Sequence, residues 1–324
     1  MKQQEFEKEY RSQWEQFAKL LDQLEGKQPS DRDEMAQFTQ HYRRVCQLLG
    51  IAKCRCYSTL LVDELNQLVI RGHQQLYRRR NHYWLSIVRF VLHTFPELVR
   101  QERRLVGLSL LFFYLPVLLF GLLTFQNERF IYSIMQPQQV AEMEAMYKPS
   151  LEKIGRVRGS DTDLYMFGFY INNNISVGFR TFAGGILFGL GSIFFLFYNG
   201  MTIGAVAGYL TQLGYGVTFY PFIAGHAAFE LTAIVLAGAA GLRLGQALIS
   251  PGPYTRIVAL RQAGLVAIQL IYGVIGMLVI AACLEAFWSS SGLISNEVKF
   301  IVAACFWLIV VVYFLFVGRQ KEAQ

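Results

Sequence analysis

The sequence is poor in charge for its length. Only 16% of its 324 residues are Asp, Glu, Lys or Arg, whereas soluble globular proteins contain about 25%. Apolar residues make up 53%, and the mean hydropathy is +0.31. This composition excludes an intrinsically disordered chain, which combines low hydrophobicity with high charge. It indicates a protein of the lipid bilayer.

Several other features are missing as well. No catalytic motif of a soluble enzyme occurs, so we expect no enzymatic activity. The five cysteines include no CxxC pair, so neither a zinc motif nor a thioredoxin-like motif is supported, and we expect no metal and no cofactor. The first 25 residues contain no apolar signal segment, so we expect the N-terminus to stay in the cytoplasm.

The basic residues do not form a nucleic-acid-binding pattern. Arginines cluster at Arg78–Arg80 and again at Arg100, Arg103 and Arg104, just before the first long apolar run. Arginines next to a membrane span are typical of topology anchors and of attraction to anionic lipid. We therefore expect the lipid bilayer, and not nucleic acid, as the partner of these clusters.

Most charges lie in the first third of the chain. Residues 1–104 contain 18 basic and 13 acidic residues, whereas 105–324 contain 12 and 10. Within 1–80, apolar residues recur at helical spacing in three segments that end near residues 25, 50 and 72. We predict a cytoplasmic helical bundle at 1–80, whose first apolar stripe either forms its core or grips a partner helix. That stripe consists of Phe6, Tyr10, Trp14, Phe17, Leu21 and Leu24.

Residues 81–104 predict an interfacial amphipathic helix and a linker. Trp84, Ile87 and Phe90 share one helix face after the arginine cluster, a pattern typical of helices that lie in the headgroup plane. Pro96 is expected to kink this segment away from the first span.

Residues 105–324 predict a transmembrane domain. Residues 105–125 carry no charge, and a helix of this length covers about 31 Å, enough for one span. A polar extracytoplasmic loop is expected at 126–163. Residues 181–229 then run for 49 positions without Asp, Glu, Lys or Arg, with a helix break expected at Asn199-Gly200. The predicted spans lie near 105–125, 181–198, 200–213, 219–247, 263–287 and 298–317.

The predicted fold class is therefore all-α: a polytopic α-helical membrane protein with about five to six spans, including a short or half helix, plus the N-terminal bundle. Arg243, Arg256, Arg261 and Arg319 should face the cytoplasm by the positive-inside rule. That requires six crossings with both termini inside. The alternative is five crossings, with 200–213 re-entrant and the C-terminus outside.

Small residues recur at four-residue spacing within the spans. In lipid such residues let helices approach closely, so we interpret them as packing positions and not as a phosphate-binding loop. They are Gly185 and Gly189, then Gly200, Gly204 and Gly208, then Gly241 and Gly245.

Three ionisable residues lie in or beside the apolar runs. His226 and Glu230 are four positions apart and share a helix face, inside or next to the longest uncharged stretch. Glu285 ends another apolar run and either joins them, or pairs with Arg180, or lies in the headgroup interface. Ionisable residues inside a membrane usually face a bundle interior or a water-filled cavity. The set could therefore relay protons or grip a substrate, or simply lock helix packing. His226 and Glu230 alone are too few for a metal site.

Amides precede the second predicted span. Asn172, Asn173 and Asn174 either cap a helix end or line a polar vestibule, with Arg180 close behind. Asn199 is interpreted as part of a helix break.

These segments together resemble the stage II sporulation protein M family. The resemblance rests on NNNISVGFRTFAGGILFGLGSIFFLFYNGMTIGA, then GHAAFELTAIVLAGAAGLRLG, then LEAFWSS, and covers about 165–290. It implies a multi-pass protein of the bacterial inner membrane. In spore formers the family member is a scaffold that recruits peptidoglycan-degrading partners. Many relatives occur in organisms that do not sporulate, so a link to sporulation is not implied.

Two functions emerge as expectations. The first is a non-enzymatic scaffold or assembly protein of the cell envelope, with protein partners at the cytoplasmic N-terminal bundle and envelope proteins outside, and homo-oligomerisation left open. The second is a transporter or channel for a small ion, metabolite or lipid that uses His226, Glu230 and Glu285. No Ser/His/Asp set supports a membrane hydrolase.

Overall fold

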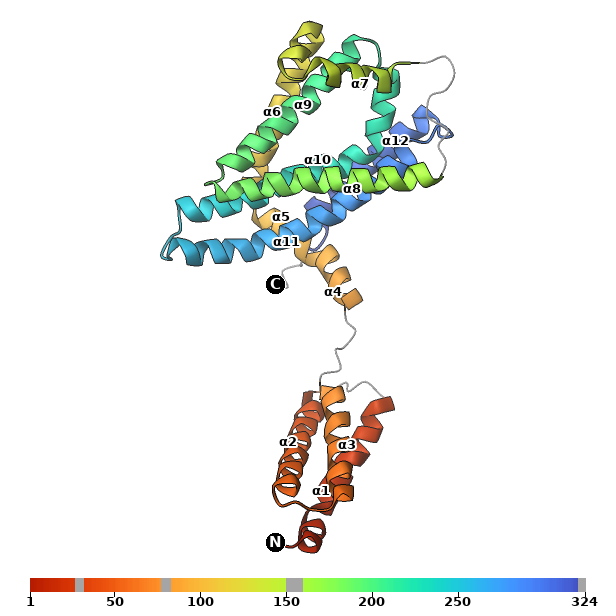
Figure 1. Ribbon diagram of the computed structural model, residues 1–324. Helices are drawn as coiled ribbons and strands as arrows, with labels where there is room; N and C mark the ends of the chain where they lie inside the picture. The colour runs from red at the N-terminus through yellow and green to blue at the C-terminus, as the bar shows by residue number, and fades with distance from the viewer. Residues whose placement is uncertain (27–31, 77–82, 150–159, 320–324) are drawn as a thin grey trace. The chain divides into compact units, whose positions relative to one another are not determined.

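The computed structural model describes residues 1–26, 32–76, 83–149 and 160–319 and divides into two compact units, Met1–Trp84 and Leu85–Gln324 (Figure 1). The described residues contain helices and no strand, which confirms the predicted all-α class. Three parts of the predicted organisation lie outside the described residues: 27–31 between the first two apolar segments, the cluster Arg78–Arg80, and the part of the predicted loop at 150–159.

The first unit is a three-helix bundle. Its helices are α1 (Gln3–Gly26), α2 (Arg32–Cys54) and α3 (Thr59–Leu76). The apolar stripe of α1 faces the core of this bundle, where Phe6, Trp14 and Phe17 are at most 1% exposed. The side chain of Leu24 is not among those described. Most of the stripe therefore serves the unit's own core.

The second helix does not end at Gly50 as predicted. It continues to Cys54, because Ala52 is fully buried and packs into the core, while a Cβ at Gly50 would meet nothing within 4 Å. The turn after α2 places Cys56 at a positive φ of 51°, and the third helix begins only at Thr59.

Residues 83–101 form three short helical pieces. They are α4 (Tyr83–Arg89), the π-helix η1 (Phe90–Thr94) and α5 (Phe95–Gln101). Helix α4 and η1 expose apolar side chains as an interfacial helix does, with Trp84 72% and Leu92 46% exposed. The Phe95 ring instead lies directly against the backbone of Gly273, where a Cβ would approach it to 2.1 Å. The second half of this segment therefore belongs to the helical core.

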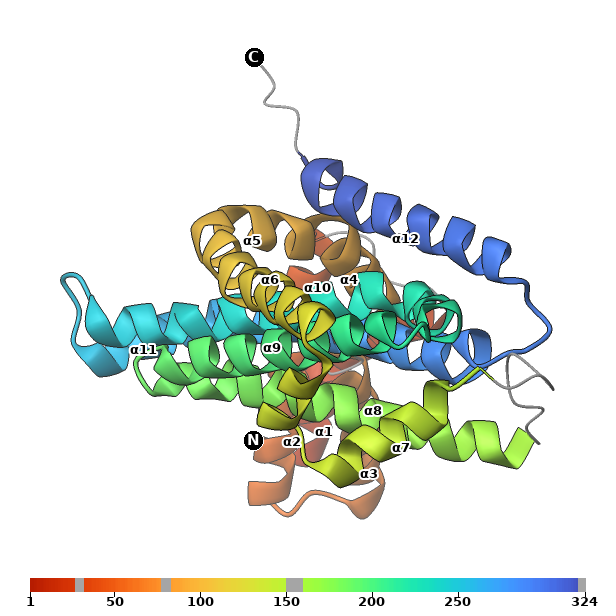
Figure 2. The ribbon, with the colours of Figure 1, turned by 90° about the horizontal axis from the view of Figure 1, so that it is seen from above.

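The second unit, here called the membrane unit, contains five helices that are long and apolar enough to cross a membrane. They span Arg103–Gln126 (α6), Leu190–Gln212 (α9), Gly216–Ile249 (α10), Arg256–Ser289 (α11 at Arg256–Cys283 with the π-helix η4 at Leu284–Ser289) and Asn296–Phe316 (α12). The other elements are η2 (Glu128–Ser133), α7 (Pro137–Tyr147), α8 (Ser160–Ala183) and η3 (Gly184–Ile186). In Figure 2, α12 lies along one edge of this unit.

The two spans predicted at 181–198 and 200–213 are wrong. A single helix, α9, runs through the predicted break and begins only after a turn that holds Gly189 at φ +82°. Asn199 does not interrupt it, because its side-chain amide donates to the carbonyl of Phe195 one turn back, at 2.7 Å. Gly200 is tolerated within the helix because it packs against the backbone of α6.

Helix α8 occupies part of the predicted loop and extends beyond it. It begins at Ser160, three residues before the predicted end of the loop, and continues to Ala183. It is not among the five apolar helices, yet it packs along α10 and α11 (Figure 1). The polar residues in the middle of α8 kept it from being predicted as a helix. Contacts with the rest of the membrane unit stabilise it as a helix.

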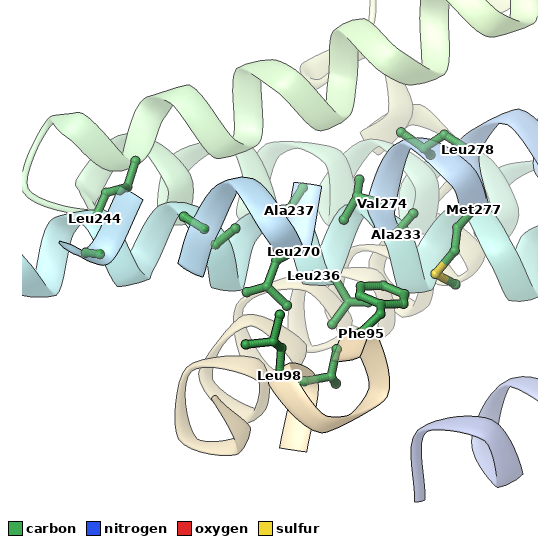
Figure 3. Close-up of a cluster of buried hydrophobic side chains, with 14 residues drawn as sticks. Phe95, Leu98, Ala233, Leu236, Ala237, Leu244, Leu270, Val274, Met277 and Leu278 are labelled. Atoms are coloured by element: carbon green, nitrogen blue, oxygen red, sulfur yellow. The ribbon is translucent and has the colours of Figure 1, made fainter. Parts of the chain in front are cut away.

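The largest apolar core of the membrane unit joins α5, α10 and α11. Figure 3 shows Phe95 and Leu98 of α5 against α10 and α11. On α10 the buried positions include Ala233 and Ala237, whose small side chains allow α11 to approach closely. This core fixes the relative positions of the two helices that carry the candidate site.

Candidate functional site

His226 and Glu230 lie one turn apart on α10. His226 is 5% exposed, and its Nε2 lies 3.7 Å from Oε2 of Glu230, whose side chain is 21% exposed. The pair therefore faces the protein interior more than its surroundings, as expected for ionisable groups in a membrane.

The π-helix η4 brings Glu285 to this pair. One ligand atom of each of His226, Glu230 and Glu285 lies within 4.8 Å of the other two. The same π-helix carries Ser289, whose Oγ lies 3.1 Å from Nδ1 of His226. Single π-turns are rare and frequently occur at functional sites. The sequence allowed three positions for Glu285: in this cluster, beside Arg180, or in the headgroup interface. In the structure Glu285 lies in the cluster.

Helix α8 contributes Asn174, which is 2% exposed. Its side-chain amide lies beside the Glu285 carboxylate, but the buried Nδ2 has no hydrogen bond of good geometry, while Oδ1 accepts from Asn173 at 3.2 Å. The three asparagines do not cap a helix end, because they lie in the middle of α8. Asn172 and Asn173 are exposed, so only Asn174 joins the cluster.

Arg180 does not reach Glu285. It is exposed in the last turn of α8. Among the described residues, the ion pairs include none of Arg180 and none of Glu285.

The glycines at four-residue spacing lie at two backbone contacts. On α9, a Cβ at Gly200 or Gly204 would lie 2.2 Å from the carbonyl oxygen of Phe113 or Val117 on α6. Gly208 approaches the backbone of Gly121 in the same way, at 2.0 Å. These contacts let α6 and α9 meet at backbone distance.

The second backbone contact lies where the turn after α8 meets α10. A Cβ at Gly185 would lie 2.1 Å from the carbonyl oxygen of Gly241, and one at Gly245 would lie 2.3 Å from the amide nitrogen of Gly189. A side chain at any of these positions would push the turn away from α10.

A family model described as stage II sporulation protein M matches residues 109–290, more than half of the chain. The chain belongs to the stage II sporulation protein M family. The matched range includes α8, α10 and η4, and therefore every member of the cluster. A second family model, described as a domain of unknown function (DUF8413), matches residues 4–78, which contain almost all of the three-helix bundle. No curated protein and no solved structure shows a significant match to the chain.

Sequence reasoning missed three side chains around the cluster of this stage II sporulation protein M family member. The first is Ser289, whose hydroxyl orients His226. The second is Lys299, 4% exposed on α12, which donates from Nζ to the carbonyls of Ser289 and Ser291, at 2.9 Å each. It thereby satisfies backbone groups at the end of η4. Ser289 ends the quoted segment LEAFWSS without standing out in it, and Lys299 belongs to no recognisable motif.

Tyr147, at the end of α7, is the third missed residue, and it too lies outside any motif. Its carbonyl accepts a hydrogen bond from the Thr218 hydroxyl, and its ring packs on Phe222, which contacts the His226 ring edge-on at 5.6 Å between centroids. Burial first, and then the nearby Glu285 carboxylate, raise the pKa of the Tyr147 phenol above its ordinary value. Tyr147 therefore lies beside the cluster.

Polar contacts at the other end of the membrane unit tie its helices together. Arg100 donates to the carbonyls of Phe314 and Val317 at the end of α12, at 3.0 and 2.7 Å. Arg243 of α10 lies 3.3 Å from Glu102, just before α6. The arginines predicted as topology anchors thus include two that bind neighbouring helices.

Proposed function

We propose that this family member is a non-enzymatic scaffold of the bacterial cytoplasmic membrane that assembles proteins of the cell envelope. The observation that carries the proposal is the division into two units with separate cores. A bundle that buries its apolar stripes in its own core has an outer surface that can bind other proteins. The partners are proteins at this bundle and envelope proteins on the outer side.

The proposed topology has both termini in the cytoplasm. Arg243 contacts Glu102, Arg100 contacts the end of α12, and Arg256 begins α11 just after the end of α10. An excess of Arg and Lys favours the cytoplasmic side. With α8 counted as a crossing beside the five apolar helices, the chain crosses six times and returns to that side.

Capture of partners from membranes tests the scaffold role. Full-length protein solubilised in mild detergent should retain specific envelope proteins, and a variant without residues 1–75 should lose at least one of them while still inserting in the membrane. Recovery of the same proteins by both forms, or of no specific protein by either, contradicts the proposal.

The convergence of His226, Glu230 and Glu285 supports a second candidate, transport of a small ion, metabolite or lipid. Placing two carboxylates close together inside a membrane costs free energy, and such groups commonly mark ion or substrate pathways. In the same preparation, Glu230→Gln should then change flux into proteoliposomes without changing partner capture. If Glu230→Gln lowers only thermal stability, the transport candidate fails.

A further inference from the structure

We propose that His226, Glu230 and Glu285 form a binding site for a divalent transition-metal ion of the Zn²⁺ or Mn²⁺ kind. This site goes beyond the proposed scaffold role and requires no transport. The sequence alone offered two ligands on α10, and the fold adds a third from η4.

The donor set matches this class of ion. One imidazole nitrogen and two carboxylate oxygens are a ligand combination that Zn²⁺ accepts, and carboxylates also suit Mn²⁺. Metal–ligand bonds of about 2.0–2.2 Å place the ligands of a tetrahedral ion roughly 3.4 Å apart. Nε2 of His226 and Oε2 of Glu230 are already 3.7 Å apart, and all three ligand atoms lie within 4.8 Å of one another, so a small rotation of one carboxylate would bring them to an ion.

The surrounding residues orient the ligands. With Nδ1–H of His226 donating to Oγ of Ser289, Nε2 presents its lone pair on the side of Glu230. Metal-binding histidines commonly donate their second ring nitrogen in this way. The π-turn of η4 positions both Ser289 and Glu285, so one element supplies a ligand and the group that orients another.

The charges also favour a cation. Among the described residues, no Lys or Arg forms an ion pair with Glu230 or Glu285, although the two carboxylates lie close together. A divalent ion would neutralise both. It would also give Asn174 a role, because its buried and unbonded Nδ2 lies beside Glu285 and can donate to the carboxylate once that group turns toward the ion.

Three protein ligands leave at least one coordination position open. Zinc sites that bind or activate small molecules keep such an open position, whereas purely structural sites are filled by four protein ligands. The partial exposure of Glu230 gives an ion access to the site.

Zinc binding by the purified full-length protein tests the proposal. Protein stripped with a chelator and held in detergent is titrated with Zn²⁺ against a chromophoric competitor, with Mn²⁺ and Mg²⁺ in parallel. We expect one high-affinity equivalent of Zn²⁺ above the background of a His226→Gln/Glu285→Gln double variant, weaker Mn²⁺ binding, and no comparable Mg²⁺ binding. The double variant subtracts ions held by exposed groups such as Cys54 and Cys56.

Matched single variants locate the ion. Glu285→Gln should weaken Zn²⁺ binding at least tenfold, and Ser289→Ala by about 10–100-fold, as expected for loss of a group that orients a ligand. Glu297→Gln, the same change at an exposed position of α12, should leave the affinity unchanged. Co²⁺ bound to the wild type should show the absorption spectrum of a nitrogen- and oxygen-ligated ion.

Two results would overturn the proposal. One is less than half an equivalent of tightly bound Zn²⁺ in total in the wild type, a result that needs no variant. The other is an unchanged affinity in a Glu285→Gln protein that elutes and melts like the wild type.

Discussion

At the residue scale, three ionisable side chains in otherwise apolar segments indicated the cluster. His226, Glu230 and Glu285 stand out in the sequence because ionisable side chains in apolar segments are costly and rarely accidental. Ser289 and Tyr147 carry no such signal, since hydroxyl groups occur throughout the chain. Ser289 reaches the site only because η4 is a π-helix, and Tyr147 only because α7 ends beside the cluster. The ionisable members of the cluster can therefore be predicted from the energetic cost of placing them in an apolar segment. The residues around them can be identified only from the fold.

A glycine substitution tests the backbone contact between α6 and α9. Gly204→Ala should destabilise the membrane unit by about 1–3 kcal/mol, because the new Cβ would lie 2.2 Å from the carbonyl oxygen of Val117. Gly276→Ala is the control, since a Cβ there meets nothing within 4 Å. Thermal unfolding in detergent compares the two. Equal effects would mean that helix propensity, and not the α6–α9 contact, governs these positions.

At the element scale, helix ends were harder to predict than helices. Asn199-Gly200 resembles a break, but the asparagine bonds to the preceding turn and the glycine is required by α6, so α9 continues. Asn172–Asn174 resemble a cap, yet they lie inside α8. Local propensity is a weak prior that tertiary contacts override. At Gly200 the deciding contact comes from α6, a helix distant in sequence.

The pairing of α1 with α3 predicts a pH effect in the first unit. Arg71 of α3 donates to Asp22 and Glu25 of α1 at 2.6 and 2.8 Å, and its bond to Glu25 holds the pKa of that carboxyl below its ordinary value. A lowered folded-state pKa stabilises the fold above the unfolded pKa, and this stabilisation is lost as the pH falls through the folded pKa. Arg71→Met should therefore destabilise the bundle near neutral pH, with a difference from wild type that narrows toward about pH 3.

Hydrogen exchange of α1 amides in the full-length protein measures this effect at each pH. Arg11→Met is the matched control, because Arg11 pairs only one turn along its own helix, with Glu7 at 3.4 Å. A loss of protection in Arg71→Met that is the same at all pH values would assign the effect to the packing of the arginine stem.

At the scale of the whole molecule, the count of crossings depends on α8. Because of its polar middle, α8 is not one of the five helices that are apolar enough to cross a membrane. It nevertheless packs along α10 and α11, which are two of those five. An odd number of crossings would place the arginines after α10 outside the cytoplasm, against the positive-inside rule.

Reporter fusions test this topology. Fusions at residue 255 and at the C-terminus should report the cytoplasm, and one after Lys148 should report the outside. The fusion after Lys148 serves as the internal control, since it depends only on α6. Periplasmic signals at both residue 255 and the C-terminus would show that α8 does not cross.

The class of this protein, its polar first third and the rare charged residues of its apolar part can be read from the amino-acid sequence alone. These features follow from composition and periodicity, because the polarity of each residue matches its environment, whether water, lipid or protein core. Three features came only from the three-dimensional fold: α9 is one helix, α8 packs within the membrane unit, and Glu285 meets His226. These outcomes depend on contacts between segments far apart in the chain, where close backbone approach and buried hydrogen bonds outweigh local preference.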